Sequence, residues 1–486
     1  MSFASYGFLF EFLPVALALV WLATAVSSRL ILPAILLVSL AFYAFSSIAH
    51  LGLLAGLVVA TWSISWIWDA VKSTVFKRVL LTLAILLNLG ALGIWKYGDS
   101  LIEVWNAIGL PYAEQPGLLL PLGISFYALQ QIGYLADLAR GRTERRSLGE
   151  YAAFVLFFPQ LLAGPIVKHS RMSAEFDRLR AGIGISERMD MAAIGFVWIA
   201  MGLFKKTVIA DTLGRIITPH IALAASGEIA SWQAWQIFLA GAPRIYFDFS
   251  GYSDMAIGLG LLFGIRLPYN FDAPFRVDNF REGWRRWHIT FHQFIRDHVY
   301  APLRRLFPNW SFAPLFALFV SAILSGLWHV DNLQFVAWGT ALFVFLWAGS
   351  RLSFRVGKGG NLARYMVVEV AACGVLTTLL LVASADVMRV LTALFAFSAG
   401  SGAAQTPLWL IGLQFAFIIG IYAFAKTEIS TQILLNGAHD HKRRHIFGWR
   451  PPVFRLEPFW ALFFAALFLC GLWFAGFSAP FIYFQF

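Results

Sequence analysis

Residues 312–328 read Phe-Ala-Pro-Leu-Phe-Ala-Leu-Phe-Val-Ser-Ala-Ile-Leu-Ser-Gly-Leu-Trp, and His329 follows directly. No residue in this stretch carries a charge. A helix of about 20 apolar residues is long enough to cross the hydrocarbon of a bilayer. The stretch therefore predicts a membrane helix with a histidine at its end.

The whole chain has the composition of a membrane protein. Of its 486 residues, 59% are hydrophobic and 13% are charged, and the mean hydropathy is +0.71. Soluble proteins carry about a quarter of their residues as charges, so that class is excluded. The two cysteines, Cys373 and Cys470, lie in apolar runs, which excludes a disulfide framework and a cysteine-based zinc site.

Similar apolar runs recur along the chain and predict an all-α polytopic membrane protein with about ten to twelve crossings. The runs are residues 8–26, 30–48, 51–68, 79–95, 117–136, 191–210, 229–246, 312–328, 334–348, 366–383, 408–425 and 459–477. The first run lacks the basic n-region of a cleaved signal peptide, so we expect it to remain as a membrane helix. We find no repeat, soluble domain or linker and expect one domain over residues 1–486.

The basic residues predict the orientation of these helices. The net charge of +11 is explained by cytoplasmic loops rich in Arg and Lys rather than by nucleic-acid binding. The basic connections are residues 69–78, 137–150, 168–188, 266–305, 351–364 and 426–455. Residues 151–167 have basic segments on both sides and contain Pro159, Gly164 and Pro165. They form either a re-entrant hairpin, buried in protein, or an ordinary crossing.

Polar residues also occur where the pattern predicts lipid. The run Arg244-Ile-Tyr-Phe-Asp-Phe-Ser-Gly-Tyr-Ser-Asp254 contains two carboxylates, and ionisable groups within a membrane are costly and mark functional sites or internal pairs. We expect the run to break its helix and to face a water-filled cavity or pair with Arg244. Asp248 is the candidate for lining the cavity, and Asp254 is the candidate for a structural ion pair.

A second polar run is Trp284-Arg-Arg-Trp-His-Ile-Thr-Phe-His292. Helical spacing places its tryptophans, His288 and Phe291 on one stripe, with the arginines on other faces, which predicts an amphipathic helix at the membrane surface. The helix either anchors the chain to lipid or receives an anionic donor that carries a nucleotide, such as a coenzyme A thioester.

His329 is the candidate catalytic residue, because a buried imidazole is neutral and can act as a base; the alternative is a structural histidine. Gly98-Asp-Ser-Leu101 matches an esterase motif, but no Asp precedes a His by three residues, so we attribute the match to chance. The pairs His288/His292 and His441/His445 lack the Glu of H-E-x-x-H, so we expect no metal site.

Several blocks of the sequence together resemble the membrane-bound O-acyltransferases, and most closely the bacterial branch that contains the alginate O-acetyltransferase membrane subunit. The blocks are Leu120–Tyr127, Phe157–Pro165, Gly202–Lys206, Ile209–Leu213, Tyr246–Gly260, Trp284–Ile289 and Ser325–His329, all within residues 7–340. The resemblance implies a catalytic histidine at His329, a second functional histidine at His288, and a fold with re-entrant or interfacial helices around a central tunnel. Residues 341–486 add C-terminal helices but no clear block.

Two departures from the family pattern bear on substrate assignment. The small residues that usually follow the catalytic histidine, Gly-Ala-Asn, are Val330-Asp331-Asn332 here, and the late Trp-x-x-Phe-Arg block is not evident near residues 382–388. We therefore expect the acceptor geometry near His329 to differ from that of the family.

The resemblance implies a bacterial inner-membrane enzyme that passes acetyl groups, with acetyl-CoA as donor and no tightly bound cofactor, toward an exported polysaccharide such as alginate. Charge asymmetry puts His288 on the cytoplasmic side and His329 deeper, so we expect a channel joining them. We expect His329 to act as general base or as transient acyl carrier, and we expect His288 and Trp287 to orient the thioester. The other substrate-binding candidates are Arg285 and Arg286, which meet the donor phosphates, and Asp248, Trp328 and Asn332.

The expected partners are membrane lipid and a periplasmic esterase-like acetyltransferase that places the acetyl group on sugar hydroxyls. Two alternatives stay open. One is D-alanyl transfer to teichoic acid by the same fold. The other is a polysaccharide transporter without chemistry, in which Asp248, Asp254 and Lys205 would line the pathway.

Overall fold

The computed structural model describes residues 2–115, 117–162, 164–275, 277, 280–329, 334–351, 374–377, 387–396, 406–427, 457–479 and 481–482. These residues form helices and connections without any strand, which confirms the predicted all-α class. They fall into two compact units, Met1–Phe196 with Ala256–Pro268, and Val197–Met255 with Tyr269–Phe486. The expectation of one domain stays a prediction. Asn332 and His441/His445 lie outside the described residues, and the run at 366–383 is described only at residues 374–377.

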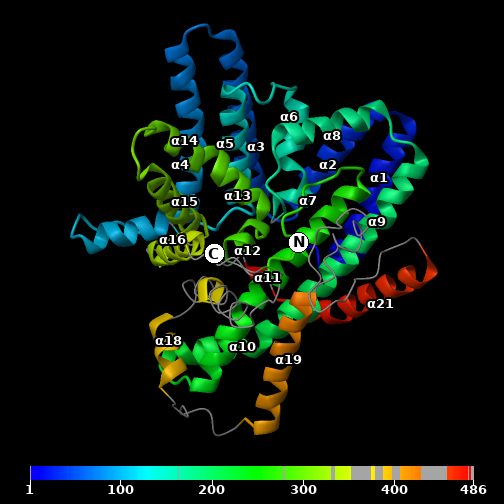
Figure 1. Cartoon of the computed structure of the whole chain (residues 1–486). Helices are drawn as coiled ribbons and strands as arrows, with labels where there is room; N and C mark the ends of the chain where they lie inside the picture. Colours follow the sequence, from blue (N-terminus) through cyan, green and yellow to red (C-terminus); the bar gives the residue numbers. More distant parts are fainter. Residues whose placement is uncertain are drawn as a thin grey trace. The chain divides into compact units, whose positions relative to one another are not determined.

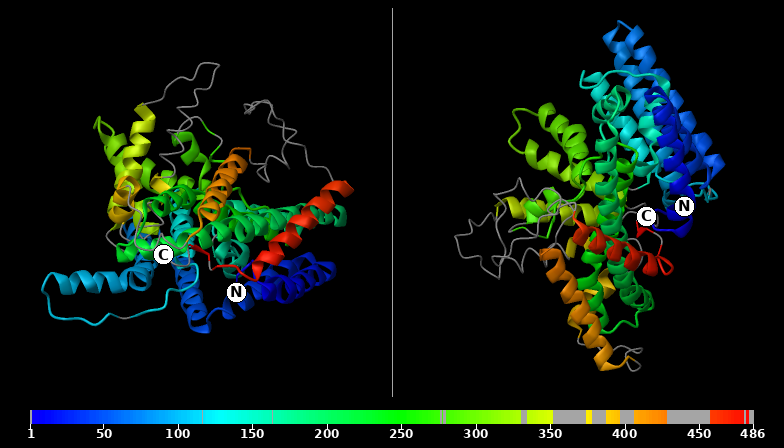
Figure 2. Two further views of the ribbon diagram at one scale, coloured as in Figure 1. Left: turned by 90° about the horizontal axis from the view of Figure 1, so that it is seen from below. Right: turned by 90° about the vertical axis from the view of Figure 1, so that its right-hand side faces the viewer.

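The first unit contains a series of helices joined by short connections. They are η1 (Gly7–Phe12), α1 (Leu13–Val26), η2 (Ser28–Leu30), α2 (Ile31–Ala44), α3 (Ile48–Ala70), α4 (Thr74–Ala107), α5 (Ile124–Ala139), α6 (Leu148–Leu156), α7 (Phe158–Leu161), α8 (His169–Ala181) and the start of α9 (Ile185–Leu203). Ser47 and Ser73 accept hydrogen bonds from the backbone N–H groups of His50 and Phe76 and so fix the starts of α3 and α4. Figure 2 shows α1 and α2, in dark blue, side by side.

Residues 151–167 do not form an ordinary crossing helix. They are divided between α6 and the four-residue α7, and nearly all of their described side chains are buried in the protein. Irregular backbone at membrane depth is tolerated only where protein or a cavity surrounds it. The structure therefore favours the re-entrant alternative.

The second unit carries the polar runs singled out above. Its helices are the end of α9, η3 (Phe204–Ala210), α10 (Asp211–Ser226), most of α11 (Ser231–Leu262), α12 (Phe280–Arg286), α13 (Ile289–Ile295), η4 (Arg296–Tyr300), α14 (Ala301–Leu306), α15 (Ala313–His329), α16 (Gln334–Arg351), α18 (Val387–Phe395), α19 (Leu408–Thr427) and α21 (Pro458–Ala475). Helices α15 and α16 lie side by side (Figure 1). Gly339 permits this approach, because an added Cβ would lie 2.8 Å from the Cα of Ile323.

Five helices of the described chain are long and apolar enough to cross a membrane. They span Gly7–Val26, Ile48–Ala70, Thr74–Ala107, Ile185–Ser226 and Pro458–Ala475. Shorter apolar helices at Ser28–Ala44, Ala313–His329, Val336–Gly349 and Leu408–Tyr422 match further predicted runs. The total number of crossings stays a prediction.

Two predictions about where helices begin or break are wrong. The helix predicted at 117–136 begins at Ile124, because Gly123 has a left-handed backbone, with φ of 74°, and ends the preceding loop. The run from Arg244 to Asp254 does not break its helix, since α11 continues from Ser231 to Leu262. Its carboxylates have lysine partners, as described below, and so need no break in the helix to reach water.

Candidate active site

His329 is the last residue of α15 and is 5% exposed. Three aromatic rings surround its imidazole. The ring centroid lies 4.6 Å from that of Trp328, 5.5 Å from that of Trp338 on α16 and 5.9 Å from that of Phe291 on α13. The helix predicted from the apolar run thus ends at the histidine. The aromatic surroundings of its ring were not predicted.

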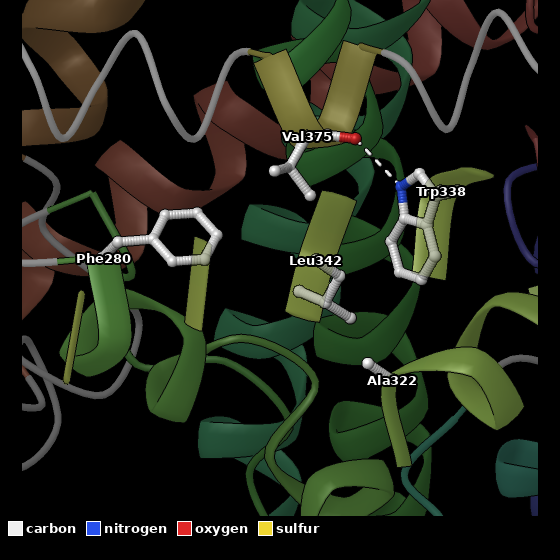
Figure 3. Close-up of a cluster of buried hydrophobic side chains, with 5 residues drawn as sticks. All are labelled: Phe280, Ala322, Trp338, Leu342 and Val375. Atoms are coloured by element: carbon white, nitrogen blue, oxygen red, sulfur yellow. Dashed lines mark hydrogen bonds between the residues drawn. The ribbon is translucent and has the colours of Figure 1, made fainter. Parts of the chain in front are cut away.

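Trp338 is held in place by the packing of α16. Its indole N–H donates a hydrogen bond of 3.0 Å to the carbonyl oxygen of Val375. The same side chain belongs to a buried cluster with Phe280, Ala322 and Leu342 (Figure 3). One wall of the His329 environment is therefore anchored in a hydrophobic core.

His288 lies at a sharp break between α12 and α13, with φ of 41° and ψ of 52°. A bulky residue in this left-handed region is strained, and such strain is concentrated at functional sites. The prediction of one continuous amphipathic helix through Trp284 and Phe291 is therefore wrong. Trp287 does not anchor the chain to lipid, because it is 3% exposed and packs against Phe271 with ring centroids 5.2 Å apart.

Asn270, in the connection between α11 and α12, fixes the orientation of His288. Its Oδ1 lies 3.0 Å from His288 Nδ1 and accepts a second hydrogen bond from the hydroxyl of Thr290. Its amide donates to Ser253 Oγ, and its backbone carbonyl accepts from the N–H of Ile289. Because Oδ1 can only accept, Nδ1 must carry the proton and Nε2 the lone pair.

His288 lies outside the candidate spans and is 1% exposed. Burial lowers the pKa of His288 well below its usual 6.5, and the nearby His329 and His292 lower this pKa further. The imidazole is therefore neutral, and Nε2 has no hydrogen-bond partner among the described residues. A neutral, oriented imidazole with an unused acceptor is suited to receive a proton or a hydrogen bond from a substrate.

The two histidines belong to one aromatic cluster. The ring of Phe291 lies 5.0 Å from His288 and 5.9 Å from His329, and the ring of Trp328 lies 5.7 Å and 4.6 Å from the same two. Phe249 on α11 covers His288 at 4.7 Å. The two imidazoles are thus neighbours in one aromatic cluster, and the channel that we expected to join them stays a prediction.

Asp248 lies in a buried ion-pair cluster with its own protein partners. Lys206 Nζ is 2.7 Å from Asp248 Oδ1 and 2.6 Å from Asp211 Oδ1. The backbone N–H of Ile482 donates to Asp248, and the hydroxyl of Ser478 donates to Asp211. Lys206 thus replaces the expected partner Arg244, and Asp248 holds the C-terminal segment against α11.

Asp254 forms the structural ion pair that the sequence suggested. Lys205 Nζ lies 3.0 Å from its Oδ2, and both side chains are buried. Lys205 and Lys206 are adjacent and belong to the π-helix η3, a helical irregularity that often marks functional sites. Each of the two reaches a carboxylate of α11. Asp248 and Asp254, the carboxylates that would line the pathway of a transporter, are therefore each paired with a buried lysine.

The remaining candidates surround the two histidines at different depths. Trp328 is 7% exposed and contacts both imidazoles. Arg285 and Arg286 lie at the end of α12, outside the buried cluster, and both contact Glu282, at 3.8 Å and 3.1 Å. The arginines are thus accessible from outside the protein core, while Trp328 is part of the buried site.

Comparison with known proteins identifies a family and several relatives. Residues 137–358 match the model of the membrane-bound O-acyltransferase family. The chain is 36% identical to a peptidoglycan O-acetyltransferase of Helicobacter pylori over 362 residues, 68% of this chain and 67% of the relative. It is also 36% identical to a probable alginate O-acetylase of Pseudomonas aeruginosa over 370 residues, 75% and 67% of the two chains. A teichoic acid D-alanyltransferase of Streptococcus thermophilus is 28% identical over 230 residues, 46% and 55% of the two chains.

The apolar helices and the family match together define a polytopic membrane enzyme that transfers acyl groups. The chain belongs to the membrane-bound O-acyltransferase family. This confirms the resemblance drawn from the sequence blocks and the expectation that the protein is an acyltransferase.

No pattern in the sequence singled out Asn270 as a site residue. Its replacement tests whether it positions His288. We expect Asn270→Leu to lower the acyl-transfer rate about 100-fold, the effect of misplacing a reacting group by ~1 Å. In Asn270→Asp a carboxylate beside His288 raises the pKa of the imidazole. The rate of this variant, relative to wild type, should then fall as the pH is lowered through that pKa, because protonated His288 cannot accept. If the ratio of the Asn270→Asp rate to the wild-type rate does not change with pH, Asn270 has only a structural role.

Proposed function

We propose that this protein is an O-acetyltransferase of the bacterial inner membrane. It takes acetyl groups from acetyl-CoA on the cytoplasmic side and passes them on for O-acetylation of an exported polysaccharide. The names of the relatives at 36% identity support acetyl as the acyl group. The acceptor polymer is alginate or another exopolysaccharide.

The observation that carries the proposal is the aromatic cluster that places His288 and His329 side by side. His329 takes the proton of the attacking hydroxyl or thiol, or carries the acetyl group itself for one step. In the first route the acceptor oxygen or sulfur bonds to the carbonyl carbon of the thioester, and its C–S bond breaks. Coenzyme A leaves as a thiolate and receives the proton that His329 took, so the imidazole returns to its neutral state.

The other candidates bind the substrates around this pair. Arg285 and Arg286 meet the phosphates of the donor, and Trp287 and His288 orient its thioester. Trp328 and Asn332 contact the acceptor side. In this proposal Asp248 acts through the C-terminal segment, because Phe481 packs against Phe249, which covers His288. A periplasmic esterase-like acetyltransferase completes the transfer to sugar hydroxyls.

The proposal is tested on exported polymer from a strain that lacks this gene and carries it back as wild type or as His329→Ala. NMR of the purified polymer measures acetyl content, and its dry mass measures export. We expect normal polymer mass with acetyl groups present only for wild type. Loss of the polymer itself would favour a transporter. Normal acetylation with the variant, or a change in D-alanyl ester content in place of acetyl, would refute acetyl transfer through His329.

A further inference from the structure

A cavity of about 570 Å³ opens at the beginning of α15, the end of that helix opposite to His329. Its walls come from the last residue of η4, from α14, from the connection 307–312 and from the first residues of α15. At a rise of about 1.5 Å per residue, the 17 residues of α15 separate this cavity from His329 by about 24 Å. It is therefore distinct from the histidine site.

The polar side of the cavity is cationic. Arg304 and Arg305 line it together with the hydroxyl-bearing Tyr300 and Ser311, and no lining residue is acidic. Neither arginine has an ion pair or a hydrogen bond within the described residues. Other arginines of the same basic segment are paired, as Arg296 is with Asp297 at 2.9 Å. Two adjacent guanidinium groups without a carboxylate are suited to bind a phosphate in a bidentate manner.

The other side of the cavity is aromatic and continues onto the surface. Phe307 and Trp310 form one wall, with ring centroids 5.7 Å apart, and Trp310 packs on Phe316 at 5.5 Å. Beside them, Leu306 is 69% exposed and Phe312 is 62% exposed. Exposed aromatic and aliphatic side chains next to arginines are typical of the level of the phospholipid headgroups, where Trp is enriched.

We propose that this cavity binds the phosphodiester headgroup of an anionic phospholipid. Arg304 and Arg305 hold the phosphate, while Phe307 and Trp310 contact the glycerol and the upper acyl chains. The exposed Leu306 and Phe312 favour a lipid over a soluble phosphate, because a soluble ligand would leave them in water. The positive end of the α15 dipole adds to the attraction for an anion. The site fixes the depth of α15, and so of His329, relative to the membrane surface.

The test measures binding of phosphatidylglycerol and of phosphatidylcholine to the purified full chain by native mass spectrometry. We expect wild type to prefer phosphatidylglycerol, and Arg304→Gln/Arg305→Gln to bind it about tenfold or more weakly, since each basic residue near anionic lipid contributes about a fewfold in affinity. Arg304→Lys/Arg305→Lys should be intermediate, because it keeps the charge but loses the bidentate geometry. Arg140→Gln/Arg142→Gln, which removes two exposed arginines elsewhere, is the matched control and should bind as wild type.

A second measurement does not depend on the arginine variants. Phosphatidylglycerol brominated on its acyl chains should quench the tryptophan fluorescence of the wild-type protein. The quenching should be smaller in Trp310→Phe, because this variant lacks the tryptophan that lines the cavity. The proposal is overturned if wild type binds both lipids equally, if the glutamine variant keeps the preference, or if Trp310 contributes nothing to the quenching. It is also overturned if coenzyme A or inorganic phosphate displaces phosphatidylglycerol at equal concentration, since the ligand would then be a soluble phosphate.

Discussion

Replacing His329 with alanine should lower acyl transfer by about 100- to 10,000-fold, the range that a positioned acid–base group supplies. The loss follows from the structure because His329 is buried among Trp328, Trp338 and Phe291, where water cannot easily replace it as a base. The rate is measured with membranes that contain equal amounts of wild-type and variant protein.

Two controls separate a catalytic loss from a folding defect. His50→Ala, in the first unit on α3, should keep the wild-type rate. His329→Gln keeps a polar side chain of similar size and should also be inactive, while its melting temperature stays close to that of wild type. Wild-type activity in either His329 variant, at normal protein levels, would contradict the assigned role.

Replacing Lys206 with methionine should destabilise the protein by about 3–5 kcal/mol, because it leaves buried charges without their partner. Lys206 is the shared cation of Asp248 and Asp211. The change should be visible as a lower melting temperature of the purified protein and as a smaller amount in the membrane.

The structural cause can be separated from a general effect of losing a lysine. Lys72→Met, at an exposed position between α3 and α4, should melt like wild type. Adding Asp248→Asn to Lys206→Met removes one unpaired charge and should restore part of the stability. A melting temperature of Lys206→Met equal to that of wild type would show that the buried pairs contribute nothing, and a double variant no better than the single would exclude the charge explanation.

The lengths of the apolar runs and the family blocks were sufficient to predict the fold class, several helices and the family of this protein. The all-α class and the helix ending at His329 follow from charge-free runs. The functional roles of His288 and His329 were implied by the family blocks, and they stay predictions. Hydropathy could not locate the start of α5, because the helix there begins after a left-handed glycine, Gly123, inside an otherwise apolar run. The hydropathy of a run does not show that one of its glycines has a left-handed backbone.

The geometry of the site depends on contacts that are distant in the sequence. A periodicity of 3.6 residues predicts one helix through residues 284–292, yet His288 adopts a left-handed backbone because Asn270 and Thr290 hold it there. Similarly, the sequence suggests that Asp248 lines a cavity, because it does not show that Lys206, on another helix, forms an ion pair with it. The Asn in Pro-Tyr-Asn270-Phe, a lone amide among apolar neighbours, was the signal that could have revealed the network.

If His288 and His329 serve one reaction, a double-mutant cycle of the two residues should show that their contributions to the rate depend on each other. Acetyl transfer from labelled acetyl-CoA is measured for His288→Ala, His329→Ala and the double variant, each purified and reconstituted in vesicles. Residues that act as a unit give losses that do not add. We therefore expect the double variant to be no slower than His329→Ala alone. Losses that multiply, or wild-type rates in both single variants, would show that the two histidines do not act together in one reaction.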